Sequence, residues 1–167
     1  MLSNCLFYEI FYCIFGINRV LFIIYKKQKI MSTTNHISTK WLGGSAFETT
    51  NTSGNTFKID DEEGTDGLRP KSLMLSGLAG CSGLDVASLI KKMKLDVDSF
   101  NIETIANLTD EHPKYYDSVT IEYHFYGNNL DEKKLQRAVD LSVDKYCGVM
   151  EMFRQFAKTE VKVIFHN

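Results

Sequence analysis

The sequence has no long run of basic residues, no Cys-x-x-Cys pair and no His-x-x-x-His pair. A formal net charge of −2 without a basic stretch gives no sign of nucleic acid or an anionic membrane as a partner. The four cysteines lie far apart, so they form neither a disulfide framework nor a zinc pattern. We therefore expect no nucleic-acid partner, no membrane partner, no bound metal and no cofactor.

The sequence does contain enough apolar material for a folded core. Of its 167 residues, 44% are hydrophobic and 12% aromatic, which separates it from disordered or low-complexity chains. A chain of this length most simply forms one domain.

Residues 1–30 differ in composition from the rest. They are rich in Leu, Ile, Phe and Tyr and end in lysines, whereas a secretory signal carries its positive charge before the apolar stretch. Glu9 and Arg19 interrupt the stretch, and a charge near a membrane midplane costs roughly 2.5–3.5 kcal/mol. We interpret 1–30 as a non-native extension from a start codon assigned too early, with the domain over 31–167; a weak membrane anchor is the alternative. Both interpretations leave the domain in the cytoplasm, where thiols are kept reduced.

Periodicity predicts an α+β domain with the order β-β-α-β-β-α-α-β and short antiparallel strands. A Thr- and Asn-rich stretch predicts a hairpin with strands over about 38–49 and 56–61. The remaining elements follow from apolar spacing and from the helix starts at Pro70 and Asp131. They are helices over 70–94, 132–145 and 149–158 and strands over 100–106, 119–125 and 161–165.

The helix expected over 70–94 has an unusual composition. No charged residue occurs from Ser72 through Leu84, so we expect this helix to be buried all round. Each glycine in a helix interior costs about 1 kcal/mol relative to alanine, so its glycines need a compensating contact. Small residues form one stripe along it: Ser76, Gly80, Gly83 and Ala87. We infer a close helix–helix contact of the kind that a dimer interface provides.

Two cysteines carry the functional hypothesis: Cys81 within that helix, and Cys147 far downstream at an expected helix break. A thiolate attacks the O–O bond of a peroxide, and a cysteine with a pKa of about 8.5 is only a few per cent ionised at neutral pH. The sulfenic acid that results condenses with a second thiol to a disulfide. Cys81 as the attacking thiol and Cys147 as the resolving thiol fit this scheme; the alternative for Cys81 is a small buried side chain in a helix contact.

The sequence neighbours of Cys81 do not explain how it would ionise. Cys81 lies well beyond the first turn of its helix, where the helix dipole stabilises an anion. Asp85, one turn further on, would raise the pKa of the thiol. Activation must therefore come from residues that folding brings to the site.

The residues around both cysteines resemble the OsmC/Ohr family. Gly67 to Val86, GLRPKSLMLSGLAGCSGLDV, resembles its first cysteine motif, and Leu141 to Val149, LSVDKYCGV, resembles its second. The resemblance covers about 38–167 and leaves 1–30 unmatched. It implies an OsmC-like intertwined homodimer, with antiparallel sheets wrapped around long central helices. It also implies thiol-dependent reduction of hydroperoxides, often organic ones, with a dithiol or a protein thiol as reductant.

The sequence departs from the peroxidase branch of that family at the activating positions. Members of that branch carry Glu where this chain has Lys71, and an Arg in the N-terminal hairpin region, which contains none here. Arg69 or Lys71 could replace that cation, and we predict Arg69 as the substrate-binding residue. Both could equally be solvated residues at a helix start. The chain looks more like the OsmC-like subgroup whose substrates are not established.

The sequence thus predicts a cytoplasmic, homodimeric cysteine-based peroxidase of the oxidative stress response. Cys81 would form the sulfenate and Cys147 would resolve it to a disulfide. The alternative is a non-catalytic dimeric protein whose apolar interface pocket binds a small hydrophobic ligand, with the cysteines serving only as packing. The redox hypothesis requires that the two thiols converge, because a disulfide needs Cα atoms nearer than about 7 Å.

Overall fold

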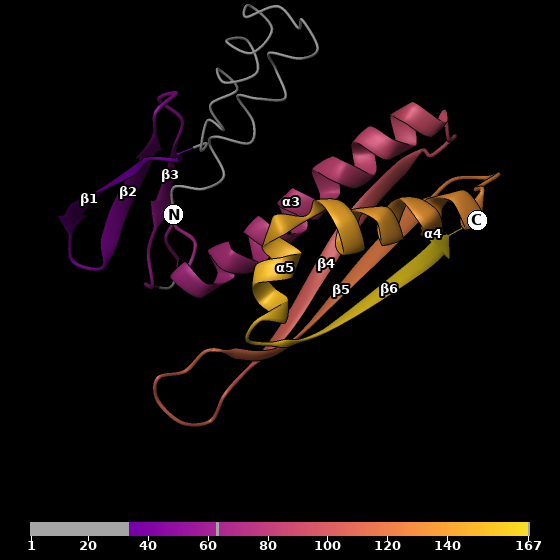
Figure 1. The fold of residues 1–167 in the computed structure, drawn as a ribbon. Helices are drawn as coiled ribbons and strands as arrows, with labels where there is room; N and C mark the ends of the chain where they lie inside the picture. The colour runs from indigo at the N-terminus through magenta and orange to yellow at the C-terminus, as the bar shows by residue number, and fades with distance from the viewer. Residues whose placement is uncertain (1–33, 63, 167) are drawn as a thin grey trace, which may run out of the picture. The chain divides into compact units, whose positions relative to one another are not determined.

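The computed structural model describes residues 34–62 and 64–166; the predictions for residues 1–30 fall outside the described residues (Figure 1). The compact unit Ser38–Asn167 contains the described elements, apart from the first residue of β1. In chain order they are β1 (Ile37–Gly43), β2 (Ala46–Asn51), β3 (Thr56–Ile59), α3 (Pro70–Met93), β4 (Ser99–Leu108), β5 (Tyr116–Tyr126), α4 (Glu132–Leu141), the π-helical turn η1 (Ser142–Tyr146), α5 (Gly148–Arg154) and β6 (Lys158–His166).

The first sheet has the order β1-β2-β3, three strands where the sequence predicted two. The difference arises at Gly43 and Gly44, whose φ angles of 110° and 55° turn the chain where we expected one continuous strand. Glycine adopts such angles without steric cost, so this pair makes a tight turn between β1 and β2. The second turn is held by the Asn51 side chain, which accepts the backbone N–H groups of Ser53 and Asn55 at 2.9 Å.

A short backbone bridge joins the first sheet to the start of α3. Leu68 pairs in parallel with Ile59, beside the buried Asp60. The Asp60 carboxylate accepts the Ser45 hydroxyl at 2.5 Å and the backbone N–H of Asp61 at 2.8 Å. Gly67 lies directly against Asp60, because a Cβ at position 67 would come within 2.5 Å of the Asp60 Cβ and 2.7 Å of its backbone nitrogen. Position 67 therefore requires glycine for lack of space.

The second sheet has the order β4-β5-β6 and completes an α+β fold, which confirms the predicted class. The β4–β5 pair is antiparallel, as expected, but β5 and β6 run parallel, with Ile121 opposite Val161. The expectation of antiparallel strands is thus wrong for this pair. The reason is the long connection through α4, η1 and α5, which returns the chain to the same end of the sheet before β6 begins (Figure 1).

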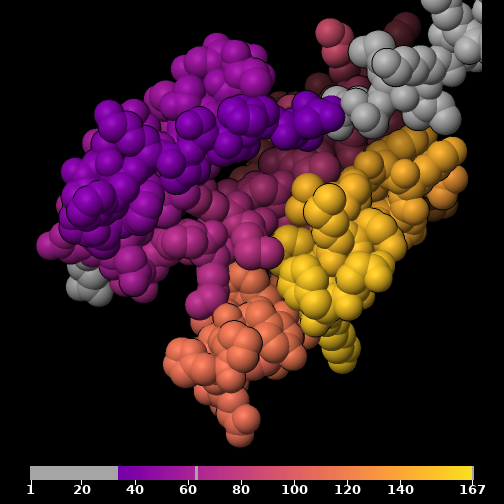
Figure 2. Space-filling model, turned by 60° about the vertical axis from the view of Figure 1, so that its left-hand side comes forward, coloured from indigo at the N-terminus to yellow at the C-terminus, as the bar shows by residue number. Residues whose placement is uncertain are grey.

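The core lies between this sheet and the helices. Alternate residues of β5 point inward and are almost fully buried: Val119, Ile121, Tyr123 and Phe125. They meet Leu78 and Val86 of α3 and the apolar side of α4, including Leu135 and Val139. Burying each large apolar side chain contributes roughly 1.5–3 kcal/mol, so this face holds the helices on the sheet. The loop between β4 and β5 stands out from the surface in Figure 2.

The expectation that α3 is buried all round is wrong for the single chain. Only Leu78, Ser82 and Val86 are buried along the helix, while Leu84 is 76% exposed. Strand β4 and the helices α4 and α5 contact one side of α3. Five of the exposed residues on its opposite side are apolar or small, and they are here named the open face of α3: Met74, Gly77, Gly80, Leu84 and Ala87. By length and composition alone α3 could span a membrane, although one side of it packs against these elements.

Candidate functional site

The fold brings Cys81 of α3 and Cys147 together from distant parts of the sequence. Cys81 packs against the buried cluster that contains Cys147, Cys81 is among the groups that raise the pKa of the Cys147 thiol, and both thiols are free. Cys81 is half-buried, whereas Cys147 is only 4% exposed and belongs to the core. The two cysteines therefore lie near each other in the fold, and their catalytic roles stay a prediction.

Cys147 is held by an irregular turn rather than by a regular helix. The sequence predicted one helix over 132–145, but α4 ends at Leu141 and the chain widens into η1. The Cys147 backbone N–H donates to the Ser142 carbonyl oxygen at 2.8 Å, the five-residue spacing of a π-helical turn. Cys147 itself is extended, with φ −75° and ψ 96°, and its sulfur accepts the Met150 backbone N–H at 3.3 Å. π-Helical turns are frequent at functional sites.

Three fully buried hydroxyl groups lie beside the thiols; we name Ser82, Tyr123 and Ser142 the hydroxyl cluster. The Ser82 hydroxyl bonds to the Tyr123 hydroxyl and lies 2.9 Å from the Ser142 hydroxyl. The Ser142 oxygen is also 3.2 Å from the Asp85 carboxylate. Each hydroxyl group can donate only one hydrogen bond. A chain of bonds in which each hydroxyl donates once satisfies this limit: Tyr123 donates to Ser82, Ser82 to Ser142, and Ser142 to Asp85.

The sequence analysis missed this cluster. Two features of the sequence could have indicated the cluster: Ser82 directly follows Cys81, and Ser142 lies in the second cysteine motif. Tyr123 lies in the strand predicted over 119–125, whose alternating pattern does not indicate a hydrogen-bonded hydroxyl. The cluster joins α3, β5 and η1, the three elements that surround the thiols. It therefore fixes how α3 and η1 meet.

Burial perturbs the protonation of two groups at the site. Burial raises the pKa of the Cys147 thiol to about 11, and the neighbouring Cys81 acts in the same direction, while the Met150 backbone N–H opposes it. Burial raises the pKa of Tyr123 to about 12, and its hydrogen bond with Ser82 acts in the opposite direction. At neutral pH Cys147 is therefore a protonated thiol and Tyr123 a protonated hydroxyl.

The structure does not bring Arg69 to the cysteines of its own chain. Arg69 precedes the first residue of α3 and pairs with Asp61 at 3.1 Å, with both side chains largely exposed. It lies twelve residues before Cys81, which corresponds to about 18 Å along the helix. Lys71 is likewise exposed, in the first turn of α3. Neither cation can activate Cys81 within one chain.

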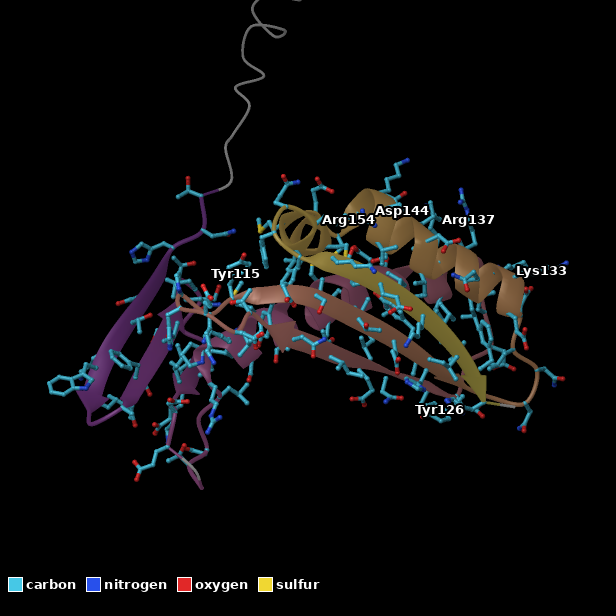
Figure 3. The ribbon with its side chains drawn as sticks, turned by 90° about the horizontal axis from the view of Figure 1, so that it is seen from below. Tyr115, Tyr126, Lys133, Arg137, Asp144 and Arg154 are labelled. Atoms are coloured by element: carbon cyan, nitrogen blue, oxygen red, sulfur yellow. The ribbon has the colours of Figure 1, made fainter. Side chains whose placement is uncertain are left out.

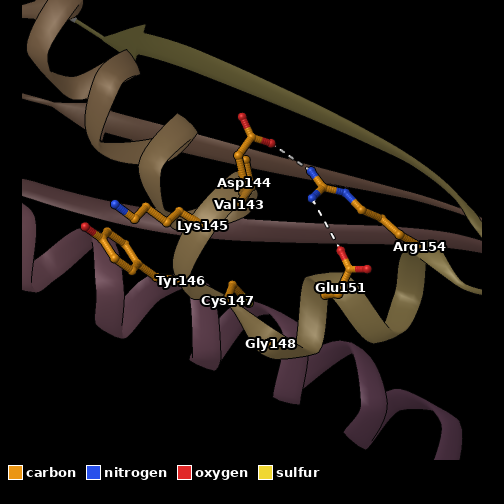
Figure 4. Close-up of a pocket in the computed structure, with 8 residues that line it drawn as sticks. All are labelled: Val143, Asp144, Lys145, Tyr146, Cys147, Gly148, Glu151 and Arg154. Atoms are coloured by element: carbon orange, nitrogen blue, oxygen red, sulfur yellow. Dashed lines mark hydrogen bonds and ion pairs between the residues drawn. The ribbon is translucent and has the colours of Figure 1, made fainter. Parts of the chain in front are cut away.

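A pocket of about 260 Å³ opens at Cys147 (Figure 4). All of its lining residues come from η1, Cys147 and α5: Val143, Asp144, Lys145, Tyr146, Cys147, Gly148, Glu151 and Arg154. Arg154 bridges the two walls, with its guanidinium 2.9 Å from Asp144 and 3.9 Å from Glu151. Arg154 and Asp144 lie on the helical side of the fold, away from Tyr126 at the end of β5 (Figure 3). No residue of α3, Cys81 included, lines the pocket.

The part of the chain that the structure describes contains no group of three or more His, Cys, Asp or Glu side chains placed to hold a metal ion. The closest imidazole pair is on the second sheet, where His124 Nδ1 and His166 Nε2 are 3.0 Å apart.

The structure is that of a small α+β protein with two thiols in one region. One thiol lies on a long apolar helix, and the second lies at a helix break beside it. A sequence profile described as OsmC-like protein matches residues 62–162, and the chain belongs to this family. The family resemblance seen in the two cysteine motifs is thereby confirmed.

Known proteins resemble this chain in sequence and in fold. Protein YhfA of Escherichia coli strain K12 is 29% identical over 116 residues, which cover 70% of this chain and 87% of YhfA. The crystal structure of a hypothetical protein from Aquifex aeolicus VF5 is 26% identical, with a TM-score of 0.72 over 81% of this chain and 99% of that one. The organic hydroperoxide resistance protein OhrB of Bacillus subtilis, 22% identical, shares the fold with a TM-score of 0.57 over 78% of this chain and 98% of its own.

Proposed function

We propose that this protein is a thiol-dependent peroxidase that reduces organic hydroperoxides, with Cys81 as the attacking thiol and Cys147 as the resolving thiol. The observation that carries the proposal is the convergence of two free thiols, because Cys81 packs against the buried cluster that contains Cys147. The protein's family and its structural similarity to OhrB, an organic hydroperoxide resistance protein, support the substrate class.

The different surroundings of the two thiols support this assignment of roles. Cys81 is the more accessible, while Cys147 is buried and protonated at neutral pH. The Cys81 thiolate attacks the terminal oxygen of the hydroperoxide; the O–O bond breaks, and the alkoxide takes up a proton and leaves as an alcohol. The Cys147 thiol then loses its proton and attacks the Cys81 sulfenic acid, which releases water and forms the disulfide. An external thiol reductant, as a reducing cytoplasm supplies, completes the cycle.

The proposal includes a homodimer. The open face of α3 is apolar or small, and Met74 and Leu84 are 47% and 76% exposed on it. On the first sheet the apolar side chains of Trp41 and Leu42 are 63% and 48% exposed. Apolar surface of this extent on a folded chain is typical of an association surface. Because Arg69 cannot reach Cys81 along its own helix, the substrate-binding role predicted for Arg69 requires a second copy of the chain.

Intact mass after one equivalent of an organic hydroperoxide tests the chemistry. The reduced protein should lose two hydrogens, and Cys147→Ser should instead gain one oxygen at Cys81. Cys81→Ser is the matched control and should do neither. Unchanged mass of the wild-type protein would contradict the proposal and favour the alternative, a dimeric protein that binds a small hydrophobic ligand.

A further inference from the structure

The pocket beside the thiols reaches only one of them. Cys147 lines it, and Cys81 does not. We propose that this pocket admits a small uncharged organic thiol, which attacks the Cys147 sulfur of the Cys81–Cys147 disulfide and frees Cys81 first. The inference rests on the proposed function only in requiring that these two cysteines form the oxidised state.

The position of the pocket suits attack on Cys147. A thiolate approaches a disulfide in line with the S–S bond, from the side of the attacked sulfur that faces away from the leaving sulfur. Cys81 is on α3, and every residue that lines the pocket comes from η1, Cys147 or α5. A thiol in the pocket therefore meets Cys147 before it meets Cys81.

The chemistry of the leaving group favours the same direction. Attack on Cys147 breaks the S–S bond, forms a mixed disulfide at Cys147 and expels Cys81 as a thiolate, which takes up a proton. The opposite attack would expel Cys147, whose pKa burial raises to about 11, and a thiol with a high pKa leaves slowly. A second reductant thiol then attacks the reductant sulfur of the mixed disulfide and releases Cys147. In sum, two thiols are oxidised to a disulfide and both cysteines are reduced.

The size and charge of the pocket define the class of reductant. Its volume is about 260 Å³, against roughly 30 Å³ for a water molecule in the liquid, so it admits a small organic thiol. Arg154 is paired with Asp144 and Glu151, and the Lys145 ammonium lies 5.6 Å from the centre of the Tyr146 ring. Two acidic and two basic side chains line it, so no net charge selects an ionic thiol. A short uncharged aliphatic thiol fits both properties.

Mapping the first thiol adduct tests the direction of attack. The full-length reduced protein is oxidised with diamide, which makes disulfides without peroxide, and treated briefly with 2-mercaptoethanol. Acid quenching, alkylation of free thiols and peptide mass spectrometry then locate the adduct. We expect 2-mercaptoethanol on Cys147 and the alkyl group on Cys81. An adduct on Cys81, an equal division between the two, or failure of diamide to form this disulfide would overturn the inference. A Cys147 adduct in a protein that does not react with hydroperoxide would refute the proposed function alone.

Filling the pocket tests its role as the entry site. A Cβ at Gly148 meets no atom within 4 Å, so Gly148→Leu adds bulk at the pocket without a clash at Cβ. We expect it to slow reduction of the disulfide by 2-mercaptoethanol by about tenfold or more, with a smaller effect for Gly148→Ala. Glu132→Leu is the matched control, because Glu132 is also the first residue of a helix but lies outside the pocket. Equal reduction rates in Gly148→Leu and Glu132→Leu would overturn the inference.

Discussion

The backbone N–H of Cys147 donates to the carbonyl oxygen of Ser142, while the hydroxyl of Ser142 lies 2.9 Å from that of Ser82 on α3. Ser142 thus binds the second cysteine through its main chain and the helix of the first through its side chain. Ser82 directly follows Cys81, so the same pair of serines sets the distance between the thiols. We therefore propose that the buried hydroxyls position the two thiols relative to each other.

Replacing Ser142 by Ala tests this positioning role. The change removes a hydroxyl bonded to Ser82 and near Asp85, and a buried polar group left without its partner costs about 1–3 kcal/mol. We expect a lower free energy of unfolding in urea and, separately, slower closure of the disulfide after one equivalent of hydroperoxide. The second effect is measured as longer-lived Cys81 sulfenic acid, trapped with dimedone.

The matched control for Ser142→Ala is Ser76→Ala. Ser76 is an exposed serine of α3 whose hydroxyl donates only to the Ser72 carbonyl oxygen at 3.1 Å. Ser76→Ala should change the free energy of unfolding by no more than about 0.5 kcal/mol. It should leave the lifetime of the Cys81 sulfenic acid unchanged. Wild-type lifetime in a folded Ser142→Ala protein would show that the cluster stabilises the fold without positioning the thiols.

The raised pKa of Cys147 predicts how stability depends on pH. Burial raises its pKa from 9.0 to about 11, so the folded state holds the proton more tightly than the unfolded state. The associated stability is fully present below pH 9 and is lost as pH rises through 11. The expected loss is on the order of 2 kcal/mol, because one pKa unit corresponds to about 1.4 kcal/mol. Urea unfolding of the reduced protein from pH 8 to 11 measures it.

Cys147→Ser provides the comparison for that pH series, because a hydroxyl does not titrate in this range. Its stability should fall less steeply than that of the wild-type protein above pH 9. Parallel curves for the two proteins would contradict the assignment of a raised pKa to Cys147.

The α+β class and the cysteine pair could be predicted from the sequence because their signals are local. Pro70 begins α3 as expected, and the helix ends at Met93, one residue before the predicted end. The two cysteine motifs indicated that the thiols belong to one site. Strand β5 also contains the residues 119–125 that the alternating pattern predicted to form a strand.

The parts that could not be predicted depend on contacts between distant residues. The parallel pairing of β6 is decided by the route of the connection and not by the composition of the strand. The Tyr123 hydroxyl finds Ser82 only once β5 lies against α3, so an alternating strand pattern could not reveal it. The exposure of Trp41, 63% in the single chain, could not be predicted either, because no local signal shows whether other parts of the same chain cover a side chain.

Gly67→Ala tests the close approach between the first sheet and the start of α3. A Cβ there would come within 2.7 Å of the Asp60 backbone nitrogen, which cannot move without breaking its bond to Leu68. We expect destabilisation of about 1–3 kcal/mol, measured by thermal or urea unfolding. Gly148→Ala is the control, since a Cβ at that position meets nothing within 4 Å. Equal stability of the two variants would show that Asp60 and Gly67 separate at little cost.

Gly80→Leu tests whether the open face of α3 is the dimer interface. Within one chain a Cβ at Gly80 meets nothing within 4 Å, and leucine is a better helix former than glycine by up to about 1 kcal/mol. A monomer should therefore tolerate the change or be stabilised by it. If a second copy packs closely on this face, the leucine should weaken association at least about tenfold, seen in sedimentation velocity as a shift from dimer to monomer. Lys133→Leu adds the same side chain to the exposed surface of α4 and should leave the sedimentation unchanged. A Gly80→Leu protein that stays dimeric at low micromolar concentration would place the interface elsewhere and leave the open face of α3 without its proposed role.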